Sequence, residues 1–343
     1  MLALQVSVTI VLFLFAIRLL GSSTDALTPF LRRVLGRIVV GDWSALGLGW
    51  FASYVLANGS IVAALSLSLF KSELLLPSQL FLMIVGSRLG GAAVVVFVGA
   101  FDYLNEELDT VRESTSLGLL TFLVTHSIYL PALALGYLWL PAIESVEGQT
   151  RLLPESDAAV RDVVSIGAEA IVELVGAGMA FVLAIGLIFL SLRLFDRVLD
   201  SVDKRQLRQR YVSKLNDKWV SFGLGLVVTG LTTSVAFSLG IVVPLYNRGH
   251  VKRDEIVPFV LGANVGTLVD TLIVAIALDT AVGALTVVVL LVVGFVLSVS
   301  VLVFYETYGR IVAAAQRELV GSTWYFVGFL LSLLLVPLLL VAV

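Results

Sequence analysis

Apolar segments long enough to cross a lipid bilayer recur along the chain. A spanning α-helix needs about 20 consecutive apolar residues, and the stretch from Met1 to Leu20 already meets this length. Hydrophobic residues make up 59% of the chain and charged residues only 14%, well below the charged share of about a quarter in soluble domains. We therefore predict an all-α polytopic membrane protein with about seven spanning helices.

The same composition argues against several classes of function. The formal net charge of −3 gives no reason to expect a nucleic-acid partner, and the lack of cysteine excludes disulfides and Cys-ligated metals. The two histidines, His126 and His250, lie far apart in sequence, so a His-rich metal site is not expected. We see no Walker-type phosphate loop and no nucleophile with a neighbouring base. We therefore expect neither an enzyme nor a resident cofactor.

The chain repeats itself. A gapless shift of 176 residues carries Trp43 onto Trp219. Matches between common apolar residues mean little in a membrane protein, but a tryptophan pair and several glycine pairs on one register indicate two related halves. The glycine pairs are Gly47 with Gly223, Gly49 with Gly225, Gly86 with Gly262, Gly90 with Gly266, and Gly118 with Gly294.

This register divides the chain into a first membrane repeat (1–142), an acidic loop (143–162), a second repeat (163–306), and a linker with a final transmembrane helix (307–343). Each repeat is expected to hold the same run of elements: a long apolar helix, a charged amphipathic stretch, an interrupted apolar segment and two further helices. The expected ranges are 2–20, 29–40, 43–70, 78–101 and 117–140 in the first half, and 163–194, 204–218, 219–246, 255–278 and 282–305 in the second.

The interrupted segments constrain the fold most closely. Each side of the break in 43–70 is about 13 residues, or roughly 20 Å of helix, which is too short to cross a bilayer. Broken backbone at that depth is tolerated only where protein or a watery cavity covers it. We interpret 43–70 and 219–246 as re-entrant hairpins that meet near the midplane; the alternative is a spanning helix with a polar kink. The tips are Asn58-Gly59-Ser60 and Thr232-Thr233-Ser234.

Hairpins that do not cross leave three crossings in each repeat, and an odd number inverts the second repeat relative to the first. The richest run of Lys and Arg lies between Arg193 and Lys218. If this run is cytoplasmic, the N-terminus is cytoplasmic as well. Met1 to Leu20 lacks a basic residue ahead of its apolar run, so we interpret it as a retained helix and not as a cleaved signal. The expected location is the plasma membrane.

Polar side chains at apolar depth are the candidate site. Hydroxyls, amides and freed carbonyls suit a small hard cation or an oxyanion, and a helix that begins at mid-membrane offers N–H groups to an anion while the end of another offers carbonyls to sodium. The alternative is that these small polar residues mediate helix packing. The candidates are Asn58, Ser60, Ser87, Arg88, Thr232, Thr233, Ser234, Asn264, Thr267 and Asp270.

Arg88 and Asp270 break the symmetry of the repeat. Arg88 stands where the second half has Asn264, and Asp270 stands where the first half has Val94. Charges inside a membrane are costly and find partners. One interpretation is that Arg88 binds an anionic substrate or replaces a bound cation. The other is that Arg88 forms an ion pair with Asp270 or with Glu173.

Glu169 and Glu173 lie four residues apart, on one face of a helix. They would form a cation or proton site, or serve as partners for Arg88. The acidic residues between Asp102 and Asp109 are expected to belong to a solvated loop.

At these positions the sequence resembles the sodium/phosphate cotransporter family. That family repeats a Gln-Ser-Ser-Ser hairpin tip followed by a Gly-Ala/Ser-Asn-Ile-Gly-Thr segment. Gly262-Ala263-Asn264-Val265-Gly266-Thr267 matches the second element almost letter for letter, and the spacing places the tips on Thr233-Ser234-Val235-Ala236 and Ala57-Asn58-Gly59-Ser60. The tips have lost the glutamine and the serine triplet, and the first half has lost the Asn and Thr of the second element.

The resemblance implies a secondary transporter that moves a small anion, phosphate first, by alternating access between the hairpin tips. Sodium is the implied coupling ion, with Thr233, Ser234 and Asn264 as its ligands. The lost tip residues leave two alternatives: an uncoupled channel or carrier, and a structural or regulatory membrane subunit. The expected partners are the lipid bilayer and the anion, and a homodimer is left open.

Overall fold

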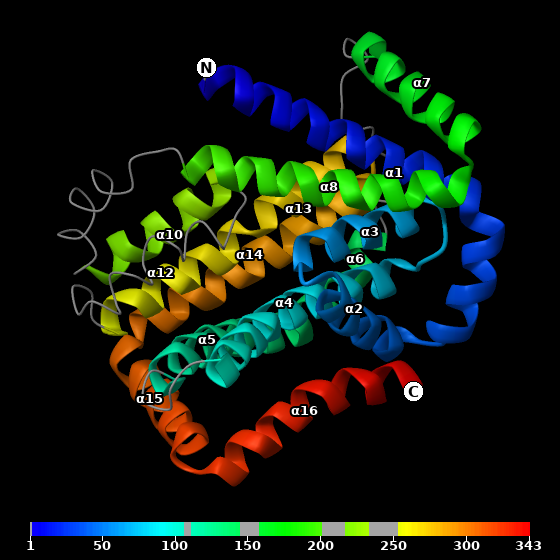
Figure 1. Cartoon of the computed structure of the whole chain (residues 1–343). Coiled ribbons are helices and arrows are strands. Elements are labelled where there is room, and N and C mark those ends of the chain that lie inside the picture. The colour runs from blue at the N-terminus through cyan, green and yellow to red at the C-terminus, as the bar shows by residue number, and fades with distance from the viewer. Residues whose placement is uncertain (1, 106–110, 145–157, 201–216, 233–252) are drawn as a thin grey trace.

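The computed structural model describes residues 2–105, 111–144, 158–200, 217–232 and 253–343, and every regular element within them is a helix (Figure 1). Seven of these helices are long and apolar enough to cross a membrane. The prediction of an all-α polytopic membrane protein is therefore confirmed. The seven candidate spans are Gln5–Ile38, Pro77–Phe97, Gly118–Tyr137, Ala177–Val198, Glu255–Ala277, Ala281–Val303 and Trp324–Ala342.

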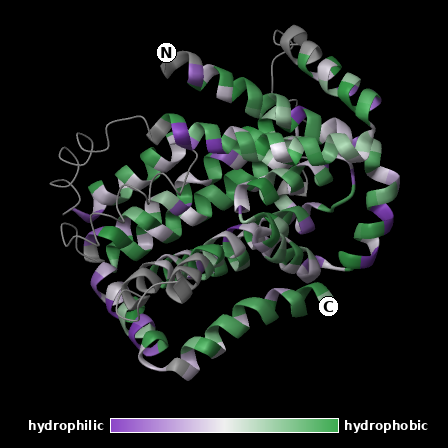
Figure 2. Ribbon diagram, in the orientation of Figure 1, coloured by the Kyte–Doolittle hydropathy of each residue, from purple (hydrophilic) through white to green (hydrophobic). Residues whose placement is uncertain are grey.

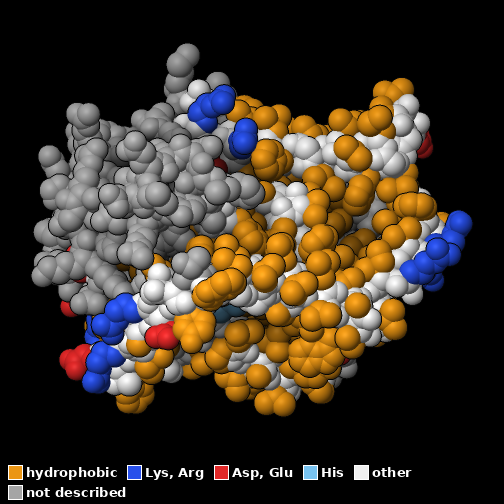
Figure 3. Space-filling view, turned by 60° about the horizontal axis from the view of Figure 1, so that its bottom comes forward, with side chains coloured by type: hydrophobic (Ala, Val, Ile, Leu, Met, Phe, Trp, Pro, Cys, Tyr) orange, Lys and Arg blue, Asp and Glu red, His pale blue; other side chains and the backbone are white. Residues whose placement is uncertain are grey.

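The surface of the described helices is suited to lipid. Hydropathy colouring shows them green over most of their length (Figure 2). On the face shown in Figure 3, hydrophobic side chains cover most of the described surface and basic side chains lie at its margins. On α16 (Thr323–Ala342), Trp324 is 85% exposed and Leu339 is 64% exposed. Such a surface would be costly in water, and it fits the hydrocarbon of a bilayer.

The first helix is longer than the sequence predicted. α1 (Leu2–Ile38) runs without interruption through the polar stretch after Leu20 and through Pro29, where we expected two separate elements. The hydroxyls of Ser23 and Thr24 both donate to the Leu20 carbonyl, at 3.0 and 2.7 Å. Because these hydroxyls bond to the helix's own backbone, they do not compete with it and the helix continues.

The apolar segment after α1 breaks at the predicted point. α2 (Asp42–Leu56) ends at Ala57, whose φ of 49° is left-handed, and α3 (Gly59–Lys71) starts after Asn58. The two helices have 15 and 13 residues, or about 22 and 20 Å at 1.5 Å per residue. Neither reaches across a hydrocarbon core of about 30 Å, and that these helices form a re-entrant hairpin stays a prediction.

The next five helices, α4 to α8, form the rest of the first half and the beginning of the second half. We expected one apolar helix over 163–194, but the chain breaks at Gly176, whose φ of +81° is open to glycine and strained for other residues. The helices before and after this break are α7 and α8. The bounds are α4 (Pro77–Asn105), α5 (Val111–Tyr137), α6 (Leu140–Glu144), α7 (Ala158–Val175) and α8 (Ala177–Asp200).

In the second half, residues 233–252, which contain Thr233, Ser234 and the expected second part of the hairpin, lie outside the described residues. The expected helix 255–278 is divided at Thr267, and the linker before the last helix is itself helical, as α15. The bounds are α10 (Lys218–Thr232), α12 (Arg253–Gly266), α13 (Leu268–Ala277), α14 (Ala281–Val303) and α15 (Tyr305–Gly321).

The two halves pack their helices in the same way. Gly49 of α2 lies so close to α4 that a Cβ atom would fall 2.2 Å from the Met83 carbonyl oxygen. Gly225 of α10 stands in the same relation to Phe259 of α12, at 2.1 Å. Each residue of the second pair is the counterpart of the first in the repeat register, so the register holds in the packing as well as in the sequence. Further close approaches of the same kind are made by Gly86, Gly90, Gly262 and Gly266.

Candidate functional site

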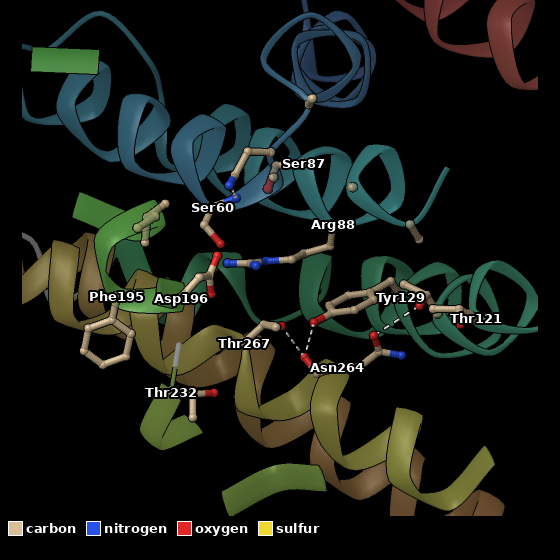
Figure 4. A pocket seen from close by; sticks show the side chains of 17 residues that line it. Ser60, Ser87, Arg88, Thr121, Tyr129, Phe195, Asp196, Thr232, Asn264 and Thr267 are labelled. Carbon is tan, nitrogen blue, oxygen red and sulfur yellow. Dashed lines mark hydrogen bonds between the residues drawn. The ribbon is translucent and has the colours of Figure 1, made fainter. Parts of the chain in front are cut away.

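A cavity of about 190 Å³, lined largely by polar side chains, lies between helices of the two halves (Figure 4). Its described walls come from both halves: the start of α3, the middle of α4 and α5, the end of α8 and α10, and α12 with the turn into α13. The polar side chains that line it are those of Asn58, Ser60, Ser87, Arg88, Thr121, Thr125, Tyr129, Asp196, Thr232, Asn264 and Thr267.

Asn58 shapes the wall at the start of α3. Its side-chain oxygen accepts hydrogen bonds from the backbone N–H groups of Ser60 and Ile61, at 2.9 and 3.1 Å. This is an N-cap, which satisfies two donors that would otherwise lack partners in the first turn. Gly59 then presses against α4, because a Cβ atom there would lie 2.5 Å from the Ser87 carbonyl oxygen. The tip is thus held against the helix that carries Arg88.

Asn264 anchors the opposite wall. Its backbone carbonyl accepts the hydroxyls of Tyr129 and Thr267, both at 2.7 Å, and its side-chain oxygen accepts the hydroxyl of Thr125 at 3.1 Å. Its amide nitrogen is buried and has no hydrogen-bond partner among the described residues. The backbone oxygen of Asn264 already accepts two hydrogen bonds and its side-chain oxygen accepts one, so only the side-chain oxygen has a lone pair left for an ion. The amide N–H group is the free donor of this wall.

The side chain of Arg88 links the two halves of the chain. It extends from α4 and is only 8% exposed. Its Nη2 atom lies 3.2 Å from Asp270 Oδ1 and also donates to the Thr271 hydroxyl, both on α13. Of the two ion pairs that the sequence left open, the structure forms the one with Asp270. Glu173, together with Glu169, lies exposed on α7.

Asp196 brings a second carboxylate to the cavity. It extends from α8, and in Figure 4 its carboxylate faces the guanidinium end of Arg88. The described charges at the cavity are therefore one guanidinium and two carboxylates, of which Asp270 is already paired with Arg88. The site is not a simple positive pocket, so an anion would depend on neutral donors as well as on Arg88.

Most of the predicted site residues meet at this cavity. Seven of the ten candidates line it, namely Asn58, Ser60, Ser87, Arg88, Thr232, Asn264 and Thr267. Asp270 reaches it through Arg88, and Thr233 and Ser234 lie outside the described residues. The sequence analysis missed Thr121, Thr125, Tyr129 and Asp196. The first three are spaced four residues apart, so one face of α5 presents them all, and that spacing was the available signal.

Residues 187–329 match the family model described as Na+/Pi-cotransporter. The match supports membership of that family, and it contains the segment from Gly262 to Thr267. No curated protein and no solved structure matches the chain. The match falls on the second half; in the first half, Gly49 makes the same kind of backbone contact as its counterpart Gly225.

Proposed function

We propose that this chain belongs to the Na+/Pi-cotransporter family and is a secondary active transporter that moves a small anion through the cavity by alternating access. Phosphate is the first candidate. The observation that carries the proposal is the cavity itself, because it is lined largely by polar side chains, lies among helices with lipid-suited surfaces, and takes residues from both halves, including the register pair Arg88 and Asn264. Sites at the interface of two repeats are the common plan of secondary transporters.

The donors around the cavity support an anion. The hydroxyls of Ser60 and Thr121, the guanidinium of Arg88 and the Asn264 amide, which has no partner among the described residues, border the same space. The Thr232 hydroxyl, by contrast, already donates to the Val228 carbonyl at 2.6 Å. A cavity of about 190 Å³ has room for phosphate with some of its water. The two carboxylates limit the positive potential, so hydrogen bonds and not net charge would select the ligand.

Coupling and orientation belong to the same proposal. We propose sodium as the coupling ion and the plasma membrane as the location, with the N-terminus on the cytoplasmic side. The Lys- and Arg-rich run from Arg193 to Lys218 supports this orientation. The short α2 and α3 helices and their break at Asn58 support the re-entrant hairpin.

The test is uptake of labelled phosphate into proteoliposomes under an inward sodium gradient. We expect saturable uptake that falls when the gradient is abolished. Thr125→Val removes the hydroxyl that bonds to Asn264, so uptake should fall about tenfold, as when a ligand-positioning group loses roughly 1.4 kcal/mol. Thr286→Val is the matched control, because the Thr286 hydroxyl is buried in α14, outside the cavity lining, and donates to the Val282 carbonyl of its own helix at 2.8 Å.

The outcomes separate the alternatives. Absence of uptake for every anion, under sodium and proton gradients alike, would exclude a transporter and favour a structural subunit. Flux that neither saturates nor responds to a gradient would identify an uncoupled channel. Equal effects of the Thr125 and Thr286 substitutions would show that the cavity is not the transport site.

A further inference from the structure

The carboxylate of Asp270 is buried beside the hydroxyl of Thr271, and these two side chains form a small cluster of oxygen atoms. Asp270 is 2% exposed, and its Oδ1 atom accepts the hydroxyl of Thr271 at 2.8 Å. Its other oxygen, Oδ2, is buried without a hydrogen-bond partner among the described residues. A buried carboxylate is costly unless a cation lies beside it. A carboxylate with a neighbouring hydroxyl is also a ligand set that hard cations prefer.

The cation in this structure is the guanidinium of Arg88. The contact is not the two-pronged pairing in which two N–H groups meet two carboxylate oxygens. One nitrogen, Nη2, serves both Asp270 Oδ1 and Thr271, while Nε is buried without a partner in the described part of the chain. Arg88 thus contacts the cluster through a single nitrogen that faces two oxygen ligands, as a small cation would.

The repeat register shows that this cation comes from one half only. The counterpart of Arg88 is the neutral Asn264, and the counterparts of Asp270 and Thr271 are Val94 and Val95. The second half therefore supplies the oxygen ligands, and the first half supplies the positive charge that they bind. Without Arg88, the cluster would hold one uncompensated negative charge next to the cavity.

We propose that Asp270 and Thr271 form a monovalent-cation site in which Arg88 is a permanently attached occupant. The side chain replaces one coupling ion, so the protein needs no sodium at this position. The positive charge stays beside the cavity through the whole cycle, where an arriving anion would meet it. The meaning of the site for coupling rests on the proposed function, but its existence does not.

The alternative is a plain structural ion pair between the halves. A structural pair loses stability when Arg88 is removed, and dissolved cations do not restore it. A tethered occupant leaves a vacant site when it is removed, and a small cation in solution should enter that site. The two interpretations therefore differ in a binding measurement that needs no transport activity.

The experiment measures the melting temperature of the purified full chain in detergent micelles. Arg88→Ala is compared in sodium chloride, in N-methyl-D-glucamine chloride of equal ionic strength, and with millimolar methylguanidinium. We expect sodium or methylguanidinium to raise the melting temperature of Arg88→Ala by several degrees in a saturable way. The wild type and Arg88→Lys should show no saturable shift, because each keeps a tethered charge.

The double variant Arg88→Ala/Asp270→Asn is the decisive control, since it lacks the carboxylate that would hold the ion. An equal cation response in the double variant, or none in Arg88→Ala, would overturn the proposal. Stabilisation of Arg88→Ala by acid alone would overturn it too, because the cluster would then bind only a proton. If Arg88→Ala does not fold, Arg88→Gln is grown and purified with and without methylguanidinium, and failure of the cation to recover folded protein refutes the idea.

Loss of phosphate uptake in the wild type would leave this binding result unchanged, so the two proposals fail separately. If both hold, phosphate uptake by Arg88→Ala should require a higher sodium concentration than uptake by the wild type. A sodium dependence that is the same in both proteins would contradict the role of Arg88 as a replacement ion.

Discussion

Gly225 offers the sharpest test of the packing that the two halves share. A methyl group at this position would fall 2.1 Å from the Phe259 carbonyl oxygen and 3.0 Å from the Ala263 nitrogen. Both are backbone atoms, so α10 and α12 must move apart by about 1 Å or more to reach van der Waals contact. Overpacking of this kind costs about 1–3 kcal/mol. We therefore expect Gly225→Ala to lower the melting temperature by several degrees.

Gly223, two residues earlier in α10, supplies the matched control. No described atom lies within 4 Å of a Cβ atom placed there, so Gly223→Ala should be neutral or stabilising by up to about 1 kcal/mol through helix propensity. The assay is thermal unfolding in detergent, followed by tryptophan fluorescence. Because the register makes Gly49 the counterpart of Gly225, Gly49→Ala should be destabilising as well. Equal melting temperatures for Gly225→Ala and Gly223→Ala would refute the close seam between α10 and α12.

Three further predictions follow from local geometry. Asn58→Ala removes the cap of α3 and should cost about 1 kcal/mol in stability, whereas Asn58→Asp keeps the acceptor and should cost less; thermal unfolding compares them. Burial raises the pKa of Tyr308, which lies outside the candidate spans, from 10.0 to about 12. The contribution of the neutral Tyr308 hydroxyl to folding stability should be complete below pH 10 and lost as the pH rises towards 12. A difference titration at 295 nm against Tyr308→Phe measures the pKa of this hydroxyl. The chain has no cysteine, so Val40→Cys and Asp217→Cys can be labelled singly in cells; inverted repeats require labelling from opposite sides.

Much of the fold could be predicted because membrane helices are encoded by local composition. Apolar length predicted the spans, and the polar run at Asn58 predicted the break after α2, because a capping side chain leaves a local signature; the left-handed residue, Ala57, leaves none. The ends of α1 and α8 were harder to place. Ser23 and Thr24 resemble helix breakers in sequence, yet here their hydroxyls bond to α1 itself. Whether such hydroxyls turn inward or outward is decided by packing, which periodicity does not report.

The candidate site was predictable in part for a different reason. Repeat symmetry located Arg88 and Asn264 together, because equivalent positions of two halves tend to meet at their interface. It could not choose between Asp270 and Glu173 as the partner of Arg88, since that choice depends on which helix lies within reach of a long side chain. Nor could it find Asp196, whose carboxylate is surrounded by basic residues in the sequence and faces Arg88 only in the fold.

The two halves differ in their charged residues at the candidate site, and this location indicates that the difference concerns the function of the site. The glycine seams, represented by Gly49 and Gly225, keep the same backbone contacts in both halves, since almost any side chain there would separate the helices. The charges of Arg88 and Asp270 have no counterparts in the opposite half, and Asp270 without Arg88 would be a buried charge that has lost its cation. A departure from symmetry in one half thus requires a matched departure in the other. Both fall beside the cavity and neither falls in a seam, which is where a change of ion or cargo would have to be made.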